Sequence, residues 1–207
     1  MARIYSTTVP TFHLDEKISP AERALLAAKQ QLHLCGYADT QMDAIAMQAG
    51  LTLSKLKRCY ADKTAITKAC ISDNIQQLQQ AFNPLLQLSV KSDLEQGEVC
   101  DQFISALDKL FEYKLYHAFI HHIATEIVGV KPIETHVLHY LSTWADVVKQ
   151  VLLLVHKTGK VTILLQQVLI TIQGGLFYRR VYRNNSYLDV SFKQIRELWP
   201  EIETAVA

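Results

Sequence analysis

Five histidines that lie close together in the sequence have side chains that could bind a metal ion. His117 and His121 are four residues apart on one expected helix with His122 beside them, and His136 and His139 follow on the next. Two histidines one helical turn apart can share a zinc or nickel ion. The segment has no HExxH motif, no acidic residue at a typical ligand spacing and no nucleophile motif, so ordinary histidines are the favoured interpretation. A helical metal-binding protein or enzyme that uses His117, His121 and His122 is the alternative.

The four cysteines show neither the close pairing of a disulfide framework nor the spacing of a metal site. They are Cys35, Cys59, Cys70 and Cys100. We expect reduced, buried or semi-buried thiols in a cytoplasmic protein. Cys59 could respond to oxidants if neighbouring cations stabilised its thiolate, but its position also suits a small core residue, which we favour.

Positive charge is concentrated in one short part of the chain. The net charge is only +1, yet residues 50–68 carry five cations against the single acid Asp62. The five are Lys55, Lys57, Arg58, Lys63 and Lys68. Residues 1–72 hold nine Lys and Arg against six Asp and Glu, and the remaining 135 residues hold twelve against fourteen. A basic surface confined to one segment suits contact with phosphate groups.

The segment 40–60, which carries most of this charge, predicts two short helices joined by a tight turn. Thr40 can cap the first helix and Thr52 the second, because a threonine hydroxyl accepts a hydrogen bond from first-turn N–H groups. Gly50 lies between them, where a left-handed backbone costs glycine little. The residues expected to face the core are Ile45, Ala46, Ala49 and Leu56. The spacing predicts a helix-turn-helix whose second helix presents cations to solvent.

Helix signals precede and follow this motif. Ser19-Pro20-Ala21-Glu22 combines an N-cap, an initial proline and a capping box, and Gly36 is expected to end that helix. Its expected buried stripe is Leu25, Ala28, Leu32 and Cys35. Asp62 can cap a long helix that runs toward Leu78, with a break or kink at Asn83-Pro84.

The remainder of the chain predicts further helices. The first opens at the Ser92 capping box and is expected to bury Val99, Phe103, Leu107 and Leu110. Three more are expected over Tyr113–Val128, which Gly129 ends, over Pro132–Val155 and over Val161–Arg180. A last helix before Pro200 is expected to bury Val190, Ile195, Leu198 and Trp199. Glycine inside a helix costs about 1 kcal/mol relative to alanine, so Gly174-Gly175 predicts close approach of another helix. The apolar stretch Val161–Ile172 is interrupted by two glutamines and is expected to fall short of a membrane span.

The sequence therefore predicts an all-α protein. Hydrophobic residues make up 49% of it, with only 7 Gly and 5 Pro. We expect a flexible arm over 1–18, a helix-turn-helix DNA-binding head over 19–75 and a helical body over 76–207.

The segment from Glu22 to Ile71 resembles the DNA-binding domain of TetR/AcrR-type transcriptional regulators, in register throughout. The residues that carry the resemblance are Ala28, Gly36, Tyr37, Thr40, Ile45, Ala46, Ala49, Gly50, Leu51, Thr52, Leu56, Tyr60, Lys63 and Ile66. In the family, the recognition helix usually reads small residue, Thr, Leu, Tyr. This chain has Ser54, Lys55, Leu56 and Lys57 there, and Tyr60 replaces the usual Phe. The operator sequence therefore cannot be carried across.

The resemblance implies a homodimer in which each recognition helix, here about Thr52 to Cys59, enters a major groove of a palindromic operator in double-stranded DNA. Thr40, Thr52 and Lys63 match positions that contact phosphates or cap the helices that point at them. Lys57 can take over the backbone contact of the family's tyrosine as a point charge. Base contacts are expected from Gln41, Leu53, Ser54 and Lys55. The expected DNA-binding residues are Thr40, Gln41, Thr52, Leu53, Ser54, Lys55, Lys57, Arg58 and Lys63.

In the family, the body helices enclose a pocket for a small-molecule effector. The resemblance therefore implies that the body over 76–207 serves effector binding and dimerisation. The lining candidates here offer aromatic walls with a few polar groups. They are Tyr113, Tyr116, His117, His121, Tyr140 and Trp144. The implied function is a cytoplasmic transcriptional repressor, released from its operator by the effector, with no enzymatic activity, no cofactor and no membrane association. A body that binds a protein partner instead of a metabolite is a further possibility.

Overall fold

The computed structural model describes residues 18–90, 95–112, 123–124, 126–127, 129–156 and 158–199. All regular structure in these residues is helical, which confirms the all-α prediction. The helices are α1 (Pro20–Asp39), α2 (Met42–Gln48), α3 (Leu53–Cys59), α4 (Lys63–Leu86), the 3₁₀ helix η1 (Gln87–Val90), α5 (Gln96–Glu112), α7 (Lys131–Leu153), α8 (Thr158–Tyr182) and α9 (Ser186–Leu198). Residues 1–17 of the expected arm, the Ser92 capping box and most of the helix expected over Tyr113–Val128 lie outside the described residues.

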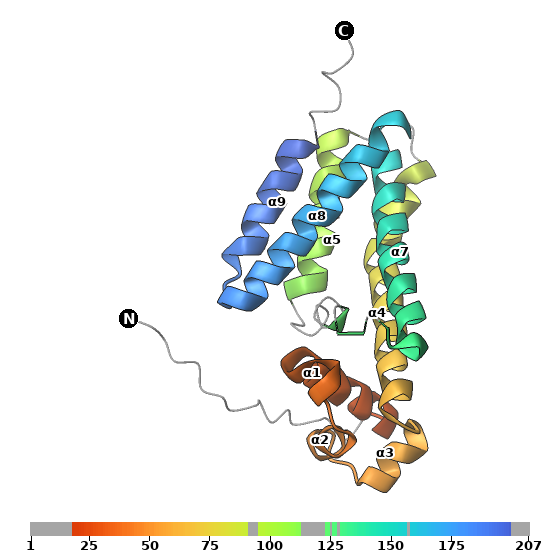
Figure 1. Cartoon of the computed structure of the whole chain (residues 1–207). Helices are drawn as coiled ribbons and strands as arrows, with labels where there is room; N and C mark the ends of the chain where they lie inside the picture. Colours follow the sequence, from red (N-terminus) through yellow and green to blue (C-terminus); the bar gives the residue numbers. More distant parts are fainter. Residues whose placement is uncertain are drawn as a thin grey trace.

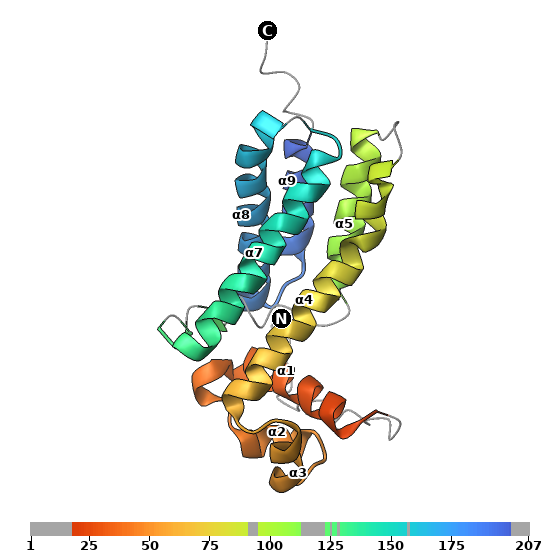
Figure 2. The ribbon, with the colours of Figure 1, turned by 90° about the vertical axis from the view of Figure 1, so that its right-hand side faces the viewer.

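Figure 1 shows a small head made of α1, α2 and α3 below a larger helical body. The long helix α4 belongs to both, because its first turns pack against α1 and its later turns pack between α5 and α7. Figure 2 shows the same helix rising obliquely out of the head and into the body. The position of the head relative to the body therefore depends on α4 and on any further contacts between the two parts.

Local capping bonds set the starts of the head helices as the sequence predicts. The Ser19 backbone N–H donates to Glu22 Oε2 at 2.9 Å, and the Glu22 N–H donates to Ser19 Oγ at 3.2 Å, so the capping box is complete. Asp62 Oδ1 accepts a hydrogen bond from the Ala65 N–H at 2.8 Å and caps α4. Each bond satisfies an N–H group that has no partner within its own helix.

Two helix ends differ from the prediction. Gly36 does interrupt α1, with φ 77° and ψ −176°, but the helix resumes beyond it and runs to Asp39. Helix α4 does not break at Asn83-Pro84, and it continues to Leu86.

The burial of one residue on α1 also differs from the prediction. Cys35, which the sequence pattern places on the buried stripe, is exposed.

The head core consists of small and branched side chains. Its fully or almost fully buried members include Ala24, Ala28, Leu32, Ile45, Ala46, Ala49, Leu56 and Ile66. The ammonium group of Lys29 on α1 is also buried, and it forms an ion pair with Asp73 on α4. Removing either partner would leave a buried or half-buried charge without its counterion, so this pair fixes α1 against α4.

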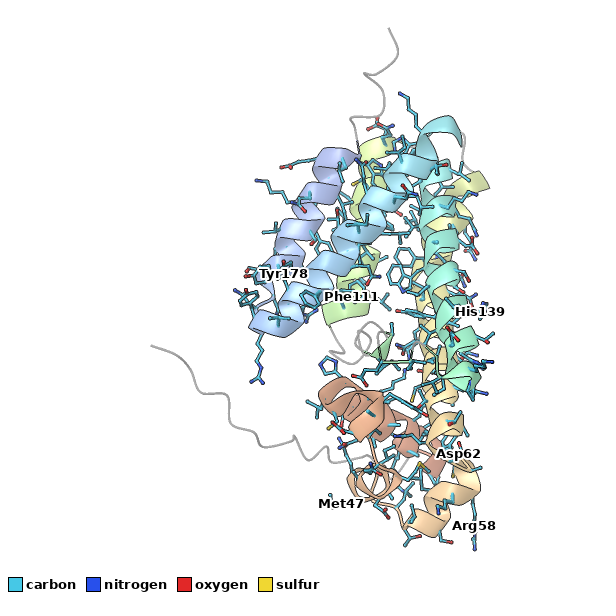
Figure 3. The ribbon with its side chains drawn as sticks, in the orientation of Figure 1. Met47, Arg58, Asp62, Phe111, His139 and Tyr178 are labelled. Carbon is cyan, nitrogen blue, oxygen red and sulfur yellow. The ribbon has the colours of Figure 1, made fainter. Side chains whose placement is uncertain are left out.

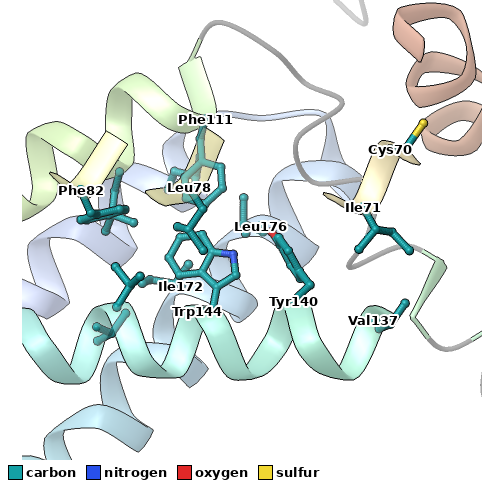
Figure 4. Close-up of a cluster of buried hydrophobic side chains, with 14 of the residues drawn as sticks. Cys70, Ile71, Leu78, Phe82, Phe111, Val137, Tyr140, Trp144, Ile172 and Leu176 are labelled. Atoms are coloured by element: carbon teal, nitrogen blue, oxygen red, sulfur yellow. The ribbon is translucent and has the colours of Figure 1, made fainter. Parts of the chain in front are cut away.

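Aromatic rings fill the centre of the body. Trp144 on α7 stacks on Phe111 with the ring centroids 5.9 Å apart and contacts Phe82 edge-on at 6.2 Å. Figure 4 shows Trp144 and Tyr140 pointing from α7 into this cluster, toward α4 and α8. Phe103 on α5 packs against Trp199 at the end of α9, so α5 and α9 share the same core.

Helix α8 is buried on one side and exposed on the other. Val161, Leu164, Val168, Ile172 and Leu176 face the core, whereas Ile163, Ile170 and Phe177 are 65, 71 and 60% exposed. Val190 of α9, expected to be buried, is 54% exposed as well. The protein therefore presents an apolar row to solvent along α8.

The segment Gly159–Arg179 within α8 is long and apolar enough to cross a membrane by length and composition, contrary to the estimate from the sequence. A third of its most apolar window is buried, and α8 packs against α7 and α9. Core helices of soluble proteins have the same length and composition, so this feature alone is weak support for a membrane span.

The glycine pair of α8 matches the predicted close helix approach at one of its two positions. A Cβ atom on Gly175 would lie 3.0 Å from Ser191 Cβ on α9 and closer still to its hydroxyl. Gly174 has no atom within 4 Å of the corresponding position. Gly175 therefore permits the packing of α8 against α9 within one chain.

Candidate nucleic-acid interface

Helix α3 is held on the head by one side and leaves the other side open to solvent. Leu56 is fully buried in the head core, and Leu53 is half-buried against it. The Thr52 hydroxyl accepts a hydrogen bond from the Lys55 N–H at 3.2 Å, which confirms the predicted cap of this helix. The side chains that remain exposed on α3 are Ser54, Lys55, Lys57, Arg58 and Cys59.

The turn before α3 gives the helix its direction. Gly50 has φ 63°, a left-handed value that glycine adopts without steric cost. The Gly50 N–H donates to Met47 O at 3.1 Å, and the Leu51 N–H donates to Ala46 O at 2.9 Å, so both bonds close the end of α2. This arrangement confirms the predicted turn between two helices.

Tyr60 anchors the other end of α3. Its hydroxyl donates to the carbonyl of Ala21 on α1 at 3.4 Å, and burial is the main cause that raises the pKa of this phenol. The ring also packs against the head core. The core interpretation of Cys59 is therefore wrong, because Tyr60 occupies the space at the end of the helix and leaves the Cys59 thiol exposed.

Six of the predicted DNA-binding residues have exposed side chains on the head. They are Gln41, Thr52, Ser54, Lys55, Lys57 and Arg58. Figure 3 shows Arg58 and Met47 of α2 both at the end of the head that points away from the body. Helix α3 contains three cations and no acid. Such a face can bind an anionic surface, and its helical shape fits a major groove.

Thr40 differs from the other candidates because its side chain is fully buried. Its hydroxyl donates to the Gly36 carbonyl, and α2 begins at Met42 with Gln41 as its N-cap residue. The prediction that Thr40 caps the first helix of the motif is therefore wrong. The left-handed Gly36 redirects the chain so that Thr40 instead closes the end of α1.

Lys63 is also occupied inside the head. Its ammonium group donates to the carbonyls of Tyr37 and Ala38 at 2.9 and 3.1 Å, and it lies 4.5 Å from the centroid of the Tyr37 ring. These contacts join the first residue of α4 to the end of α1. Lys63 is thus placed to support the head behind the exposed face of α3.

Met47 is a feature that the sequence prediction left out. Its side chain is 80% exposed on α2, the helix that packs against α3. The helical period gives the signal, since Ile45, Ala46 and Ala49 face the core and Met47 falls on the opposite side. An exposed, flexible apolar side chain next to a basic helix can contact base methyl groups or sugars.

Two of the six predicted effector contacts fall within the described residues. Tyr140 and Trp144 lie one turn apart on α7, and both are buried in the aromatic core. Burial raises the pKa of the Tyr140 phenol strongly, so this group stays neutral at all ordinary pH values. Tyr113, Tyr116, His117 and His121 lie outside the described residues, as does His122.

The histidines that the structure describes give no support to a metal site. His139 is exposed, and burial together with the charge of Lys68 lowers the pKa of the half-buried His136. Among the described residues, no group of three His, Cys, Asp or Glu side chains could hold a metal ion.

The sequence matches no protein-family model and no curated protein. Several solved structures are similar in fold. A TetR transcriptional regulator from Legionella pneumophila has a TM-score of 0.74 at 18% identity and covers 88% of this chain and 98% of its own. A TetR-family regulator from Agrobacterium tumefaciens has a TM-score of 0.71 at 15% identity, with 86% and 96% covered.

The fatty acid degradation regulator FadR from Bacillus halodurans has a TM-score of 0.71 at 12% identity, with 91% and 99% of the two chains covered. The likeness spans head and body together in all three. The chain therefore has the fold of TetR-family transcriptional regulators.

Proposed function

We propose that the protein is a TetR-like DNA-binding transcriptional regulator, and specifically a repressor that a small-molecule effector releases from a palindromic operator. The observation that carries the proposal is the exposed cationic face of α3, capped by Thr52 and fixed by the buried Leu56. Lys55, Lys57 and Arg58 are exposed, and none of them forms an ion pair within the part of the chain that the structure describes. The comparisons support the proposal at the level of fold.

Contacts to DNA divide into two groups by chemistry. Lys55, Lys57 and Arg58 are exposed cations that suit phosphate oxygens, and such contacts set affinity and register. Gln41 and Ser54 are exposed neutral polar side chains that can exchange hydrogen bonds with base edges. Leu53, Thr40 and Lys63 lie behind this surface, and they act by holding the helices in place.

A homodimer would place two such heads on the two half-sites of a palindrome. The exposed row Ile163, Ile170 and Phe177 repeats every seven residues along α8. Helices pair through apolar residues at this period. Gly174 is four residues after Ile170 and three before Phe177, so it lies on the same face and leaves room for the partner's helix.

An effector would act by binding one arrangement of the body better than the other. Tyr140 and Trp144 are candidate contacts within the aromatic core, with walls that suit an apolar or aromatic molecule. A ligand that bound both arrangements equally would leave the operator occupied, so release requires preference for the non-binding state. A protein with these activities would work in the cytoplasm.

Genomic fragment capture at several salt concentrations tests the proposal. Purified protein should enrich a palindrome, with the protein's own upstream region as the first candidate. Lys57→Ala should then weaken binding to all sequences and reduce the slope of log affinity against log salt by roughly one unit. Lys193→Ala on α9 removes an exposed cation outside the head and should leave the slope unchanged.

Two results would contradict the proposal. Weak binding to all fragments without a preferred sequence would argue against an operator. An unchanged salt slope in the Lys55, Lys57 and Arg58 variants would remove α3 from the DNA footprint.

A further inference from the structure

Among the described residues, the carboxylate of Glu126 in the body contacts the end of α1. Glu126 lies in the connection between α5 and α7, and its Oε2 accepts hydrogen bonds from the backbone N–H groups of Tyr37 at 2.7 Å and Ala38 at 3.3 Å. The residues are nearly ninety positions apart in sequence, so this contact depends on the way the body sits on the head. A negative oxygen bound by two successive N–H groups makes a strong, directional contact.

Gly36 makes room for this carboxylate. Its φ of 77° favours glycine, and a Cβ atom at this position would lie 2.6 Å from Glu126 Oε2 and 2.8 Å from its carboxyl carbon. Gly36, which precedes the two N–H donors, is therefore required for two reasons: its backbone is left-handed, and its missing side chain leaves space for the carboxylate. The carboxylate fits closely against bare backbone.

The same short segment is bound from the other side by the head itself. The carbonyls of Tyr37 and Ala38 accept hydrogen bonds from Lys63, the first residue of α4. Lys63 follows α3 after only three residues. The segment 37–38 therefore connects the body's carboxylate to the residue next to the recognition helix.

The backbone that carries Glu126 is itself fixed in the body. The Glu126 and Ile127 N–H groups both donate to the Ile123 carbonyl, at 3.0 and 2.9 Å. The side chains of Ile123 and Ile127 are buried in the hydrophobic core. A rearrangement of that core would therefore move the carboxylate relative to the head.

We propose that Glu126 is a positioning residue that fixes the orientation of the head on the body, and that its withdrawal from Tyr37 and Ala38 frees the head to turn. Gly36 leaves the space that this contact needs, and Lys63 holds the same segment through the carbonyl groups of that segment. The consequence for DNA rests on the proposed function, but the contact can be measured without DNA.

Amide hydrogen exchange in the full-length protein tests the contact directly. Glu126→Ala removes both acceptors, and Glu126→Gln keeps the size of the side chain but removes its charge. In Glu126→Ala the Tyr37 and Ala38 amides should exchange about tenfold faster or more, since bonds to charged groups are among the strong ones. The effect in Glu126→Gln should be smaller, and body amides such as that of Val148 should be unchanged in both variants.

Glu98→Gln is the matched control, because it removes an exposed carboxylate from α5 without touching the head. Its exchange pattern at residues 37 and 38 should equal that of the wild-type protein. Wild-type exchange at both amides in Glu126→Ala and in Glu126→Gln would overturn the proposal. If Glu126→Ala fails to fold, Glu126→Gln is measured alone: faster exchange of the Tyr37 and Ala38 amides supports the proposal, and wild-type exchange overturns it.

Operators with altered spacing between half-sites test the functional consequence. A fixed head should prefer one spacing, and Glu126→Ala should bind the preferred spacing less tightly while losing discrimination against spacings one base pair longer or shorter. A residue needed only for stability would lower binding to every spacing by the same factor, and that result would overturn the positioning role. Failure of the wild-type protein to bind any operator would instead count against the proposed function, with the exchange result still deciding the contact.

Discussion

Lys63 and Tyr37 contact each other in two ways. The Lys63 ammonium group donates to the Tyr37 carbonyl at 2.9 Å and also lies 4.5 Å from the centroid of the same residue's ring. The pair joins the start of α4, which three residues separate from the end of α3, to the end of α1. A residue that the family resemblance associates with phosphate thus has a clear structural task in this chain.

Replacing Lys63 with Met should destabilise the head while affecting the DNA contact less than loss of Lys57. The variant keeps the apolar stem but loses two charge-assisted hydrogen bonds and the ring contact, with an expected cost of about 1–2 kcal/mol. Urea denaturation measures the loss, and Lys68→Met on the same helix is the control. Undiminished stability together with a salt slope reduced by roughly one unit would show that Lys63 contacts phosphate instead.

Removing the cap of α4 should also weaken the head. Asp62→Ala leaves the Ala65 N–H without its acceptor, and loss of such a cap costs about 0.5–2 kcal/mol. Asp62→Asn should retain most of the stability, because its amide oxygen can accept the same bond. Equal thermal midpoints for the Ala and Asn variants would mean that the cap contributes little here.

The features that could be predicted from the sequence are mostly local. Ser19, Thr52 and Asp62 cap helices because each acts on an N–H group within three residues of itself. The buried faces of α2 and α3 follow from helical spacing in the same way. Resemblance to a known family then supplied the arrangement of head and body, which matches the observed fold.

The errors arise where distant segments meet. Thr40 was misplaced because α1 resumes beyond the left-handed Gly36 and ends at Asp39, so Thr40 closes that helix and α2 starts at Met42. Cys59 was misplaced because Tyr60, not Cys59, packs against the head core at the end of α3. The contact between Glu126 and the Tyr37 N–H could not be predicted, since it depends on the packing of the body against the head. Helical periodicity carries no information about such contacts.

The four thiols should react in two classes. Burial raises the pKa of Cys70 to about 12 and that of Cys100 to about 11, so both remain protonated and unreactive at pH 8. Cys35 and Cys59 are exposed and should react with a thiol reagent in the folded protein. Mass spectrometry of the labelled protein identifies the sites, and unfolding should make all four reactive.

Operator DNA should protect one of the two exposed thiols. Cys59 lies at the end of α3 within the proposed footprint, whereas Cys35 lies on α1. Labelling of Cys59 should therefore slow when DNA is added, while Cys35 serves as the internal control. Equal labelling of Cys59 with and without bound operator would place the end of α3 outside the interface.

Gly175→Ala should destabilise the body, although alanine favours helix. The new Cβ would press on Ser191, whose hydroxyl donates to the Thr171 and Tyr187 carbonyls, and a methyl group forced into such packing costs about 1–3 kcal/mol. Gly159→Ala in the first turn of the same helix meets no atom within 4 Å and should be neutral or stabilising by up to about 1 kcal/mol. Thermal unfolding of the two variants compares them, and a Gly175→Ala protein as stable as Gly159→Ala would contradict the close packing of α8 on α9.

The exposed row on α8 should control dimer formation. Ile170→Glu places a charge at the centre of the row formed with Ile163 and Phe177, and an unpaired charge in an apolar interface opposes association. Light scattering after size exclusion should show a dimer for the wild-type protein and a monomer for the variant at the same concentration. Leu138→Glu is the matched control, because this leucine is 60% exposed but lies on α7, and its variant should remain dimeric. A dimeric Ile170→Glu protein would move the interface elsewhere, whereas a folded monomer that no longer binds a palindrome would connect the α8 row to operator recognition.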